Sequence, residues 1–97
     1  MHAMDKQVSD EPPSPSDRAA AAAEALVGTL RMARALVRSR RSLDLAGLEQ
    51  EVGRLCAAAL DLPPAEGRAM RPKLVLVLAE LDALSASVAA AVEDDET

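Results

Sequence analysis

The side chains that most often carry enzyme chemistry are scarce in this sequence. His2 is the only histidine and Cys56 the only cysteine. His2 lies in a polar, proline-rich stretch, where no helix or strand can hold an imidazole beside a serine, a cysteine or a zinc ion. Carboxylates are numerous, but no pair lies in a pattern that forms a cleft, and "AEGRA" is not a phosphate-binding glycine loop. The sequence therefore predicts a noncatalytic protein with no cofactor and no metal site.

Cys56 lies among apolar neighbours, in "RLCAAAL". A reactive thiol needs access to solvent and nearby positive charge, so we expect a small core residue here. A single cysteine cannot form a disulfide within the chain, which fits a reducing compartment. The prediction is a cytoplasmic protein.

Four arginines share one face of the first predicted helix, at spacings of three, four and three: Arg31, Arg34, Arg38 and Arg41. This strip could bind an acidic partner, the acidic end of the chain or nucleic acid. It could also be a solvated surface that pairs with carboxylates of the same chain, among them Glu49, Glu51 and Glu80. The net charge of −5 and the absence of aromatic residues argue against nucleic acid and anionic lipid as partners.

A wholly apolar run, Leu74 to Leu78, follows several helix breakers. At about 100° per residue, Val75 and Leu76 point well away from the face that Leu74 and Leu81 would bury. Burial of a Val or Leu is worth about 1.5–3 kcal/mol, so we expect something to cover them. The alternatives are the segment "PAEGRAMR" folding back with Met70, a second copy of the chain, or an apolar helix of a client protein.

The predicted partner-binding residues all lie in the last helix, and they combine the apolar run with the leucines that follow it: Leu74, Val75, Leu76, Leu78, Leu81 and Leu84. The alternative is that this run is the most enclosed part of a small bundle or of a homodimer interface.

Composition indicates an all-α fold. The sequence has no Phe, Trp, Tyr or Ile, and alanine, the best helix former, is abundant. We expect an antiparallel three-helix bundle, or coiled-coil-like hairpin, over residues 17–92. A disordered leader of residues 1–16 precedes it and an acidic tail of residues 93–97 follows it. No stretch approaches the roughly 20 residues of a membrane span.

Three helical segments are predicted, at about residues 17–40, 44–61 and 72–92. Ser16 or Asp17 would cap the first, and Asp44 would cap the second, with a hydrophobic staple from Leu43 to Leu48. Each segment carries one apolar seam at spacings of three and four. The seams are Ala19, Ala23, Leu26, Leu30, Ala33 and Val37; then Leu45, Leu48, Val52, Leu55, Ala59 and Leu62; then Leu74, Val77, Leu81, Leu84, Val88 and Ala91.

The sequence leaves two possible starts for the third helix, Pro64 and Pro72. Pro72 most simply occupies its first turn, where the missing N–H costs nothing. The alternative is one long helix that begins at Pro64 and is kinked at Pro72. The first arrangement is the preferred prediction.

From Ala25 to Ala90 the sequence resembles the small flagellar type III export chaperones of the FlgN-like family. The points of similarity are the long first helix, the turn at Asp44 and Leu45 followed by Leu48 and Glu49, and the leucine-rich last helix with "LAELDAL". The resemblance implies a cytosolic chaperone without ATPase activity. It would hold hook-associated, filament-junction proteins before export, with much of the client binding on the last helix.

The sequence thus favours a noncatalytic helical binding protein, most specifically a flagellar export chaperone with a protein client. The runner-up is a homodimeric structural or scaffolding module that uses the same apolar residues. The third alternative is a small regulatory protein that contacts an acidic partner or nucleic acid through the strip from Arg31 to Arg41.

Overall fold

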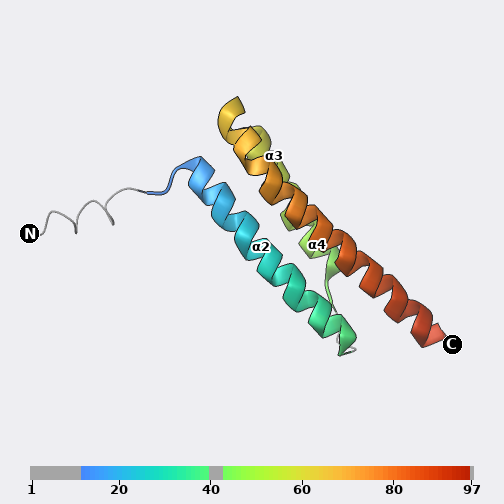
Figure 1. The fold of residues 1–97 in the computed structure, drawn as a ribbon. Coiled ribbons are helices and arrows are strands. Elements are labelled where there is room, and N and C mark those ends of the chain that lie inside the picture. Colours follow the sequence, from blue (N-terminus) through green and yellow to red (C-terminus); the bar gives the residue numbers. More distant parts are fainter. Residues whose placement is uncertain (1–11, 40–42, 97) are drawn as a thin grey trace, which may run out of the picture.

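The computed structural model of the chain describes residues 12–39 and 43–96, and these form a bundle of three helices. The helices are α2 (Pro15–Arg38), α3 (Leu45–Leu60) and α4 (Pro64–Glu96). The all-α expectation is confirmed (Figure 1). Of the predicted leader, residues 1–11 lie outside the described part, as does Thr97 of the predicted acidic tail.

Helix α2 begins earlier than the sequence predicted. Its N-cap is Ser14, whose side chain accepts a hydrogen bond of 3.0 Å from the backbone N–H of Asp17. Pro15 fits directly behind this cap because the first helical residue needs no N–H partner. The expected cap at Ser16 or Asp17 is therefore wrong, since both residues already lie inside the helix. The helix ends at Arg38, two residues before the predicted end.

The cap of α3 is the predicted one. Asp44 accepts a hydrogen bond of 3.0 Å from the N–H of Gly47 through its Oδ1. A Cβ at position 47 would lie 2.5 Å from Asp44 Oδ2, so the absence of a side chain there lets the carboxylate sit over the helix end. Leu43 and Leu48, the predicted staple residues, are half-buried and both pack against the core.

Helix α4 begins at Pro64, so the preferred start at Pro72 is wrong. The carbonyl of Pro63 accepts a hydrogen bond of 2.8 Å from the N–H of Gly67, which closes the first turn. The helix then continues through Pro72 to Glu96, four residues past its predicted end. The burial of Met70 explains why the turns of α4 before Pro72 pack against the bundle. Its side chain is 2% exposed and extends the apolar seam by one turn.

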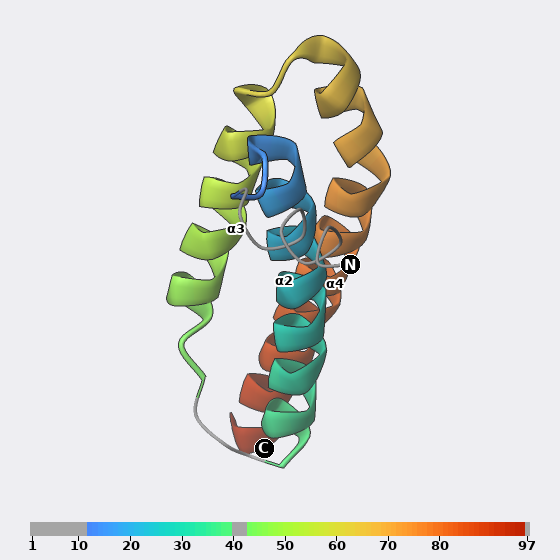
Figure 2. The same ribbon diagram turned by 90° about the vertical axis from the view of Figure 1, so that its left-hand side faces the viewer.

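The first and last helices form the main interface of the bundle. Helices α2 and α4 run side by side in the same direction along most of their lengths, and α3 runs in the opposite direction beside them (Figure 1 and Figure 2). The contact between α2 and α4 is more extensive than the contact of either with α3. Helix α4 is thus held chiefly from one side.

The core is built from the predicted seams. All six seam residues of α2 are buried, together with Val27, which the spacing pattern did not include. Helix α3 and the turn after it contribute four buried residues, and α4 contributes three: Val52, Leu55, Ala59 and Leu62; then Met70, Val77 and Leu84. The remaining seam leucines are half-buried and pack against this core. The largest fully buried side chains are Leu30, Val77 and Leu84.

Candidate functional site

Helix α4 has two apolar faces. The first, here called the inner seam, points into the bundle and repeats every four and three residues: Met70, Leu74, Val77, Leu81, Leu84, Val88 and Ala91. The second, here called the outer face, consists of exposed residues: Pro72, Val75, Leu76, Leu78, Ala79 and Ala86. An ordinary amphipathic surface helix carries charged or polar residues on the side where this helix has its outer face.

The structure divides the six predicted partner-binding residues between these two faces. Val75, Leu76 and Leu78 are 61%, 43% and 47% exposed. Leu74 and Leu81 are half-buried against the core. Leu84 is fully buried at 0% exposure, so it belongs to the core and not to the accessible surface. The prediction that Leu84 belongs to the apolar seam is therefore confirmed, and the prediction that Leu84 contacts a partner is wrong.

One of the three predicted covers for Val75 and Leu76 is ruled out. The segment "PAEGRAMR" does not fold back, because it forms the first two turns of α4 itself. Met70 points into the core and not over the outer face. No other segment of the described residues 12–39 and 43–96 covers these side chains, as their exposure shows. Of the three predicted covers, a second copy and an apolar helix of another protein remain.

Small residues continue the outer face toward the C-terminus of α4. Ala79, Ala86 and Ala90 are exposed, and Ala83 is half-buried. Alanine permits helix axes to approach to about 8 Å, the near end of the usual range. The outer face therefore offers large side chains in its first half and a flat surface in its second.

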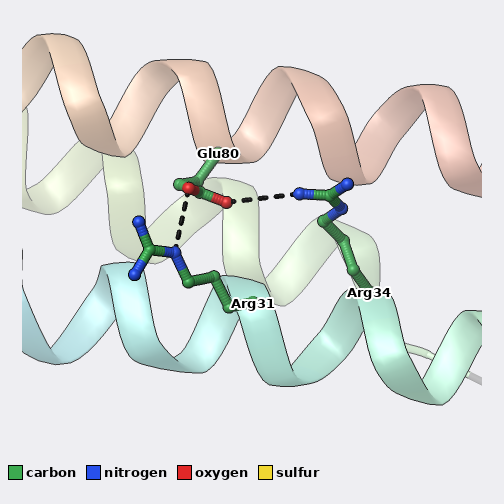
Figure 3. A network of polar contacts seen from close by, with 3 residues as sticks. All are labelled: Arg31, Arg34 and Glu80. Carbon is green, nitrogen blue, oxygen red and sulfur yellow. Dashed lines mark hydrogen bonds and ion pairs between the residues drawn. The ribbon is translucent and has the colours of Figure 1, made fainter.

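Two of the four predicted strip arginines bind a glutamate of the same chain. Arg31 Nε donates a hydrogen bond of 3.0 Å to Glu80 Oε2, and Arg34 Nη1 lies 3.6 Å from Glu80 Oε1 (Figure 3). The Glu80 side chain is 13% exposed. Arg38 is exposed in the last turn of α2, and Arg41 lies outside the described residues. The arrangement is the internal pairing that the sequence left as one alternative.

Glu80 and Arg34 attract each other by charge, without a hydrogen bond between them. Glu80 Oε1 and Arg34 Nε are both buried, and neither has a hydrogen-bond partner among the described residues. A buried acceptor without a donor costs about 1–3 kcal/mol, which offsets part of the attraction between the charges. The contact of Glu80 with the two arginines therefore positions α4 against α2 more than it stabilises the fold.

A second ion pair joins the same two helices at the same register. Lys73 Nζ lies 4.0 Å from Glu24 Oε2, and this pair, like Arg31 and Glu80, joins residues 49 positions apart. The signs are reversed between the two pairs. A slip of α4 by seven residues would place Glu24 beside Glu80, or Arg31 beside Lys73, and like charges repel. The two pairs thus disfavour a slip of α4 by seven residues against α2.

Two open grooves flank α3. The larger, of about 640 Å³, lies between α2 and α3 and is lined mainly by alanines and by charged residues at its rim: Arg18, Ala22, Ala25, Glu51, Arg54, Ala58 and Asp61. The smaller, of about 520 Å³, lies between the end of α3 and the start of α4 and includes Cys56, Leu60, Arg68, Arg71 and Leu74. Cys56 is half-buried and packs against the core, so it is less enclosed than predicted.

Neither groove brings together a set of residues with recognisable catalytic geometry. Within the described part of the chain, no group of three His, Cys, Asp or Glu side chains is placed to hold a metal ion. The groove between α3 and α4 shares Arg71 and Leu74 with the edge of the outer face.

Helix α4 is also long and apolar enough to cross a membrane. Within Pro64–Glu93, an 18-residue window has a mean hydropathy of 1.9, and 11% of that window is buried. By length and composition, the prediction that no stretch approaches a membrane span is therefore wrong. The core helix of a soluble protein meets the same criterion when it is mostly buried, which this window is not. The helix does carry Glu80 and Asp82 amid its apolar residues. An aspartate at the centre of a bilayer costs about 2.5–3.5 kcal/mol.

Comparisons of the chain with models of known protein families, with curated proteins and with solved structures found no match.

Proposed function

We propose that this protein is a noncatalytic binding protein whose outer face on α4 contacts an apolar helix of a protein partner. The observation that carries the proposal is the exposure of Val75, Leu76 and Leu78, three large apolar side chains within four residues. Single exposed apolar residues are common on protein surfaces, but Val75 and Leu78 lie on the same side of α4 within one turn, and adjacent exposed apolar residues mark an interaction surface.

The shape of the surface favours a helix as the bound element. The outer face follows one side of a long helix, and its alanines allow a second helix to pack closely. Recognition of an amphipathic helix requires only apolar anchors at helical spacing on the partner and a complementary surface. Full burial of a Val or Leu is worth about 1.5–3 kcal/mol, and Val75 and Leu78 are already about half buried, so the two would supply part of a micromolar affinity of about −8 kcal/mol.

Within this class, we propose a flagellar type III export chaperone that holds a hook-associated, filament-junction protein in the cytoplasm. The support for this narrower proposal is the resemblance from Ala25 to Ala90, including the capped turn at Asp44. In that family the last helix carries much of the client binding, and here four of the seven exposed large apolar residues of the described chain lie on the last helix: Val75, Leu76, Leu78 and Val92.

A role for the arginine strip in binding an acidic partner is less favoured. Arg31 and Arg34 are both occupied by Glu80, which removes half of the proposed strip from the charge available to a partner.

The homodimer alternative is favoured by a separate observation, the pattern of charges at the two ends of the apolar run.

The test is binding of a purified hook-associated protein to the wild type and to the double variant Val75→Asp, Leu76→Asp. A client at 100 times its Kd should raise the stability of the wild type by about 2.7 kcal/mol, seen as a higher Tm. The double variant should keep its helical circular dichroism and lose both the binding and the Tm rise.

A matched control is Met32→Asp, Leu36→Asp, which places the same two charges on exposed apolar residues of α2. This control should bind the client like the wild type. Binding that survives in the folded α4 variant would remove the outer face from the proposal. Failure of every hook-associated protein to bind would leave only the broader class of helical binding protein, to be tested with other clients.

A further inference from the structure

The six apolar residues 74–79 of α4 lie midway between two opposite charges. In the stretch "RPKLVLVLAELD", Arg71 and Asp82 stand at the two ends, and both side chains are exposed. At about 100° per residue, eleven residues bring Asp82 back to within about 20° of Arg71 on the helix surface. The two charges therefore lie on the same side of α4.

These two charges cannot pair with each other within one chain. With a rise of about 1.5 Å per residue, they are about 16 Å apart along the helix. Among the described residues, neither makes an ion pair with another side chain, in contrast to Lys73 and Glu80 nearby. Each is thus available to a partner that carries the opposite charge.

Two exposed apolar residues lie between the charges on this side of the helix. Val75 and Leu78 continue from Arg71 to Asp82 at spacings of four, three and four, which is the spacing of a coiled-coil seam. At about 100° per residue, these four side chains lie within about 60° of one another. Leu76 points about 130° away from their centre. The four residues Arg71, Val75, Leu78 and Asp82 are here called the dimer stripe.

The dimer stripe is symmetric about its own centre. The midpoint between Arg71 and Asp82 falls between residues 76 and 77, and Val75 and Leu78 are equally far from that point. A twofold axis through this midpoint, perpendicular to α4, would place a second α4 antiparallel to the first. Arg71 would then face Asp82 of the other copy, and Val75 would face Leu78 of the other copy, each contact occurring twice.

From this pattern we infer that two copies of the chain associate through the dimer stripe of α4, in antiparallel orientation about this axis. The charge pattern is what selects a second copy over other occupants. A parallel pair in register would place arginine beside arginine and aspartate beside aspartate, whereas the antiparallel pair matches opposite charges at both ends. The inner seam stays within each bundle, so neither copy has to open.

The interface is small, because each copy contributes two large exposed apolar side chains, Val75 and Leu78, with Leu74 and Ala79 at the edges. Contacts of this size give weak and reversible association. The inference rests on the proposed function in one respect, because both use Val75 and Leu78 as contact residues. A client helix and the second copy would compete for them, so the dimer would shield these residues until a client binds.

The test is charge reversal measured by sedimentation equilibrium on the purified full chain, with no client present. Arg71→Asp alone, or Asp82→Arg alone, places like charges at both ends of the interface and should weaken dimerisation about tenfold. Since both residues are exposed, each variant should keep the helical circular dichroism and the urea unfolding midpoint of the wild type at concentrations where the chain is monomeric.

The sharpest measurement mixes the two single variants. In a mixed dimer the aspartate introduced at position 71 of one chain faces the arginine introduced at position 82 of the other. At the opposite end of the interface the two native residues face each other, so both pairs attract. The mixture should therefore dimerise like the wild type although neither variant does so alone. The double variant Arg71→Asp, Asp82→Arg should also recover dimerisation, since it exchanges the two charges within each chain.

A second measurement locates the axis by disulfide formation under mild oxidation in a Cys56→Ser background. A mixture of Val75→Cys and Leu78→Cys should form a linked dimer of one chain of each kind, because these positions face each other across the axis. A parallel pair would instead link two chains of Val75→Cys to each other. The matched control is Val75→Cys mixed with Leu76→Cys, which should stay unlinked because residue 76 points away from the dimer stripe.

The inference is overturned if the wild type is a monomer at all concentrations up to the millimolar range, which would leave the outer face to a client alone. It is also overturned if the single reversals dimerise like the wild type, which would place the contact elsewhere. Because no client enters these measurements, their failure is distinct from failure of the proposed chaperone function.

Discussion

On α4, residues of the same type are buried on one side of the helix and exposed on the other. Val77 is fully buried, whereas Val75, two residues earlier, is 61% exposed; Leu84 is fully buried, whereas Leu76 is 43% exposed. The difference lies in the neighbours, because α2 and α3 cover only the inner seam. The comparison shows that this helix carries more apolar surface than its own bundle can bury. Three pairs of substitutions probe the difference between the two faces and the border between them.

The largest effect is expected from truncation on the inner seam. Leu84→Ala would leave a cavity in the core and should lower the free energy of unfolding by about 3 kcal/mol. Leu78→Ala removes the same atoms from the outer face, where the side chain is 47% exposed, and should cost less than about 1 kcal/mol. Urea unfolding of both variants measures the difference, and equal losses would mean that the two faces are not distinct.

An intermediate effect is expected at Pro72, which lies on the outer face inside α4. It removes one helical hydrogen bond, and the freed carbonyl of Arg68 can be hydrated because this side of the helix is exposed. Pro72→Ala should therefore raise the free energy of unfolding by about 2 kcal/mol. Pro64→Ala, at the first position of the helix, should change it much less. A loss of stability in Pro72→Ala would show that the bundle depends on the proline.

The smallest effect is expected from Glu80, at the border between the two faces. Glu80→Ala removes the partner of Arg31 and Arg34 and should cost about 1 kcal/mol, less at high salt. A double-mutant cycle with Arg31→Ala would isolate the pair, with a coupling of about 0.5 kcal/mol expected. No coupling at low salt would indicate that the register is set by the apolar seams alone.

Much of the fold can be predicted from residue spacing. Alanine-rich composition and repeats of three and four predict the helices and nearly all core residues of α2, because helical periodicity alone decides which side chains share a face. The Asp44 cap is also predictable, since Asp directly before an apolar helix satisfies free N–H groups in a recognisable way. The start of α2 is harder to place because Ser14 and Pro15 form the cap together, inside a stretch that looks like a proline-rich linker.

The start of α4 is hard to predict for a different reason. A proline inside a helix is unfavourable by local rules, and only the burial of Met70 against the core outweighs that cost. Tertiary contacts likewise decide that Glu80 receives both Arg31 and Arg34. Those contacts depend on the register between α2 and α4, which local spacing along either helix does not specify.

The pairing of α2 with α4 has a consequence for synthesis of the protein. Residues in its two cross-helix ion pairs are 49 positions apart, so α2 leaves the ribosome well before the segment that shields its apolar side. During that interval Leu26, Leu30 and Val37 remain open to solvent and to other nascent chains. Slow translation between α3 and α4 would lengthen this interval and raise the yield of aggregates, whereas rapid delivery of α4 would close the bundle sooner.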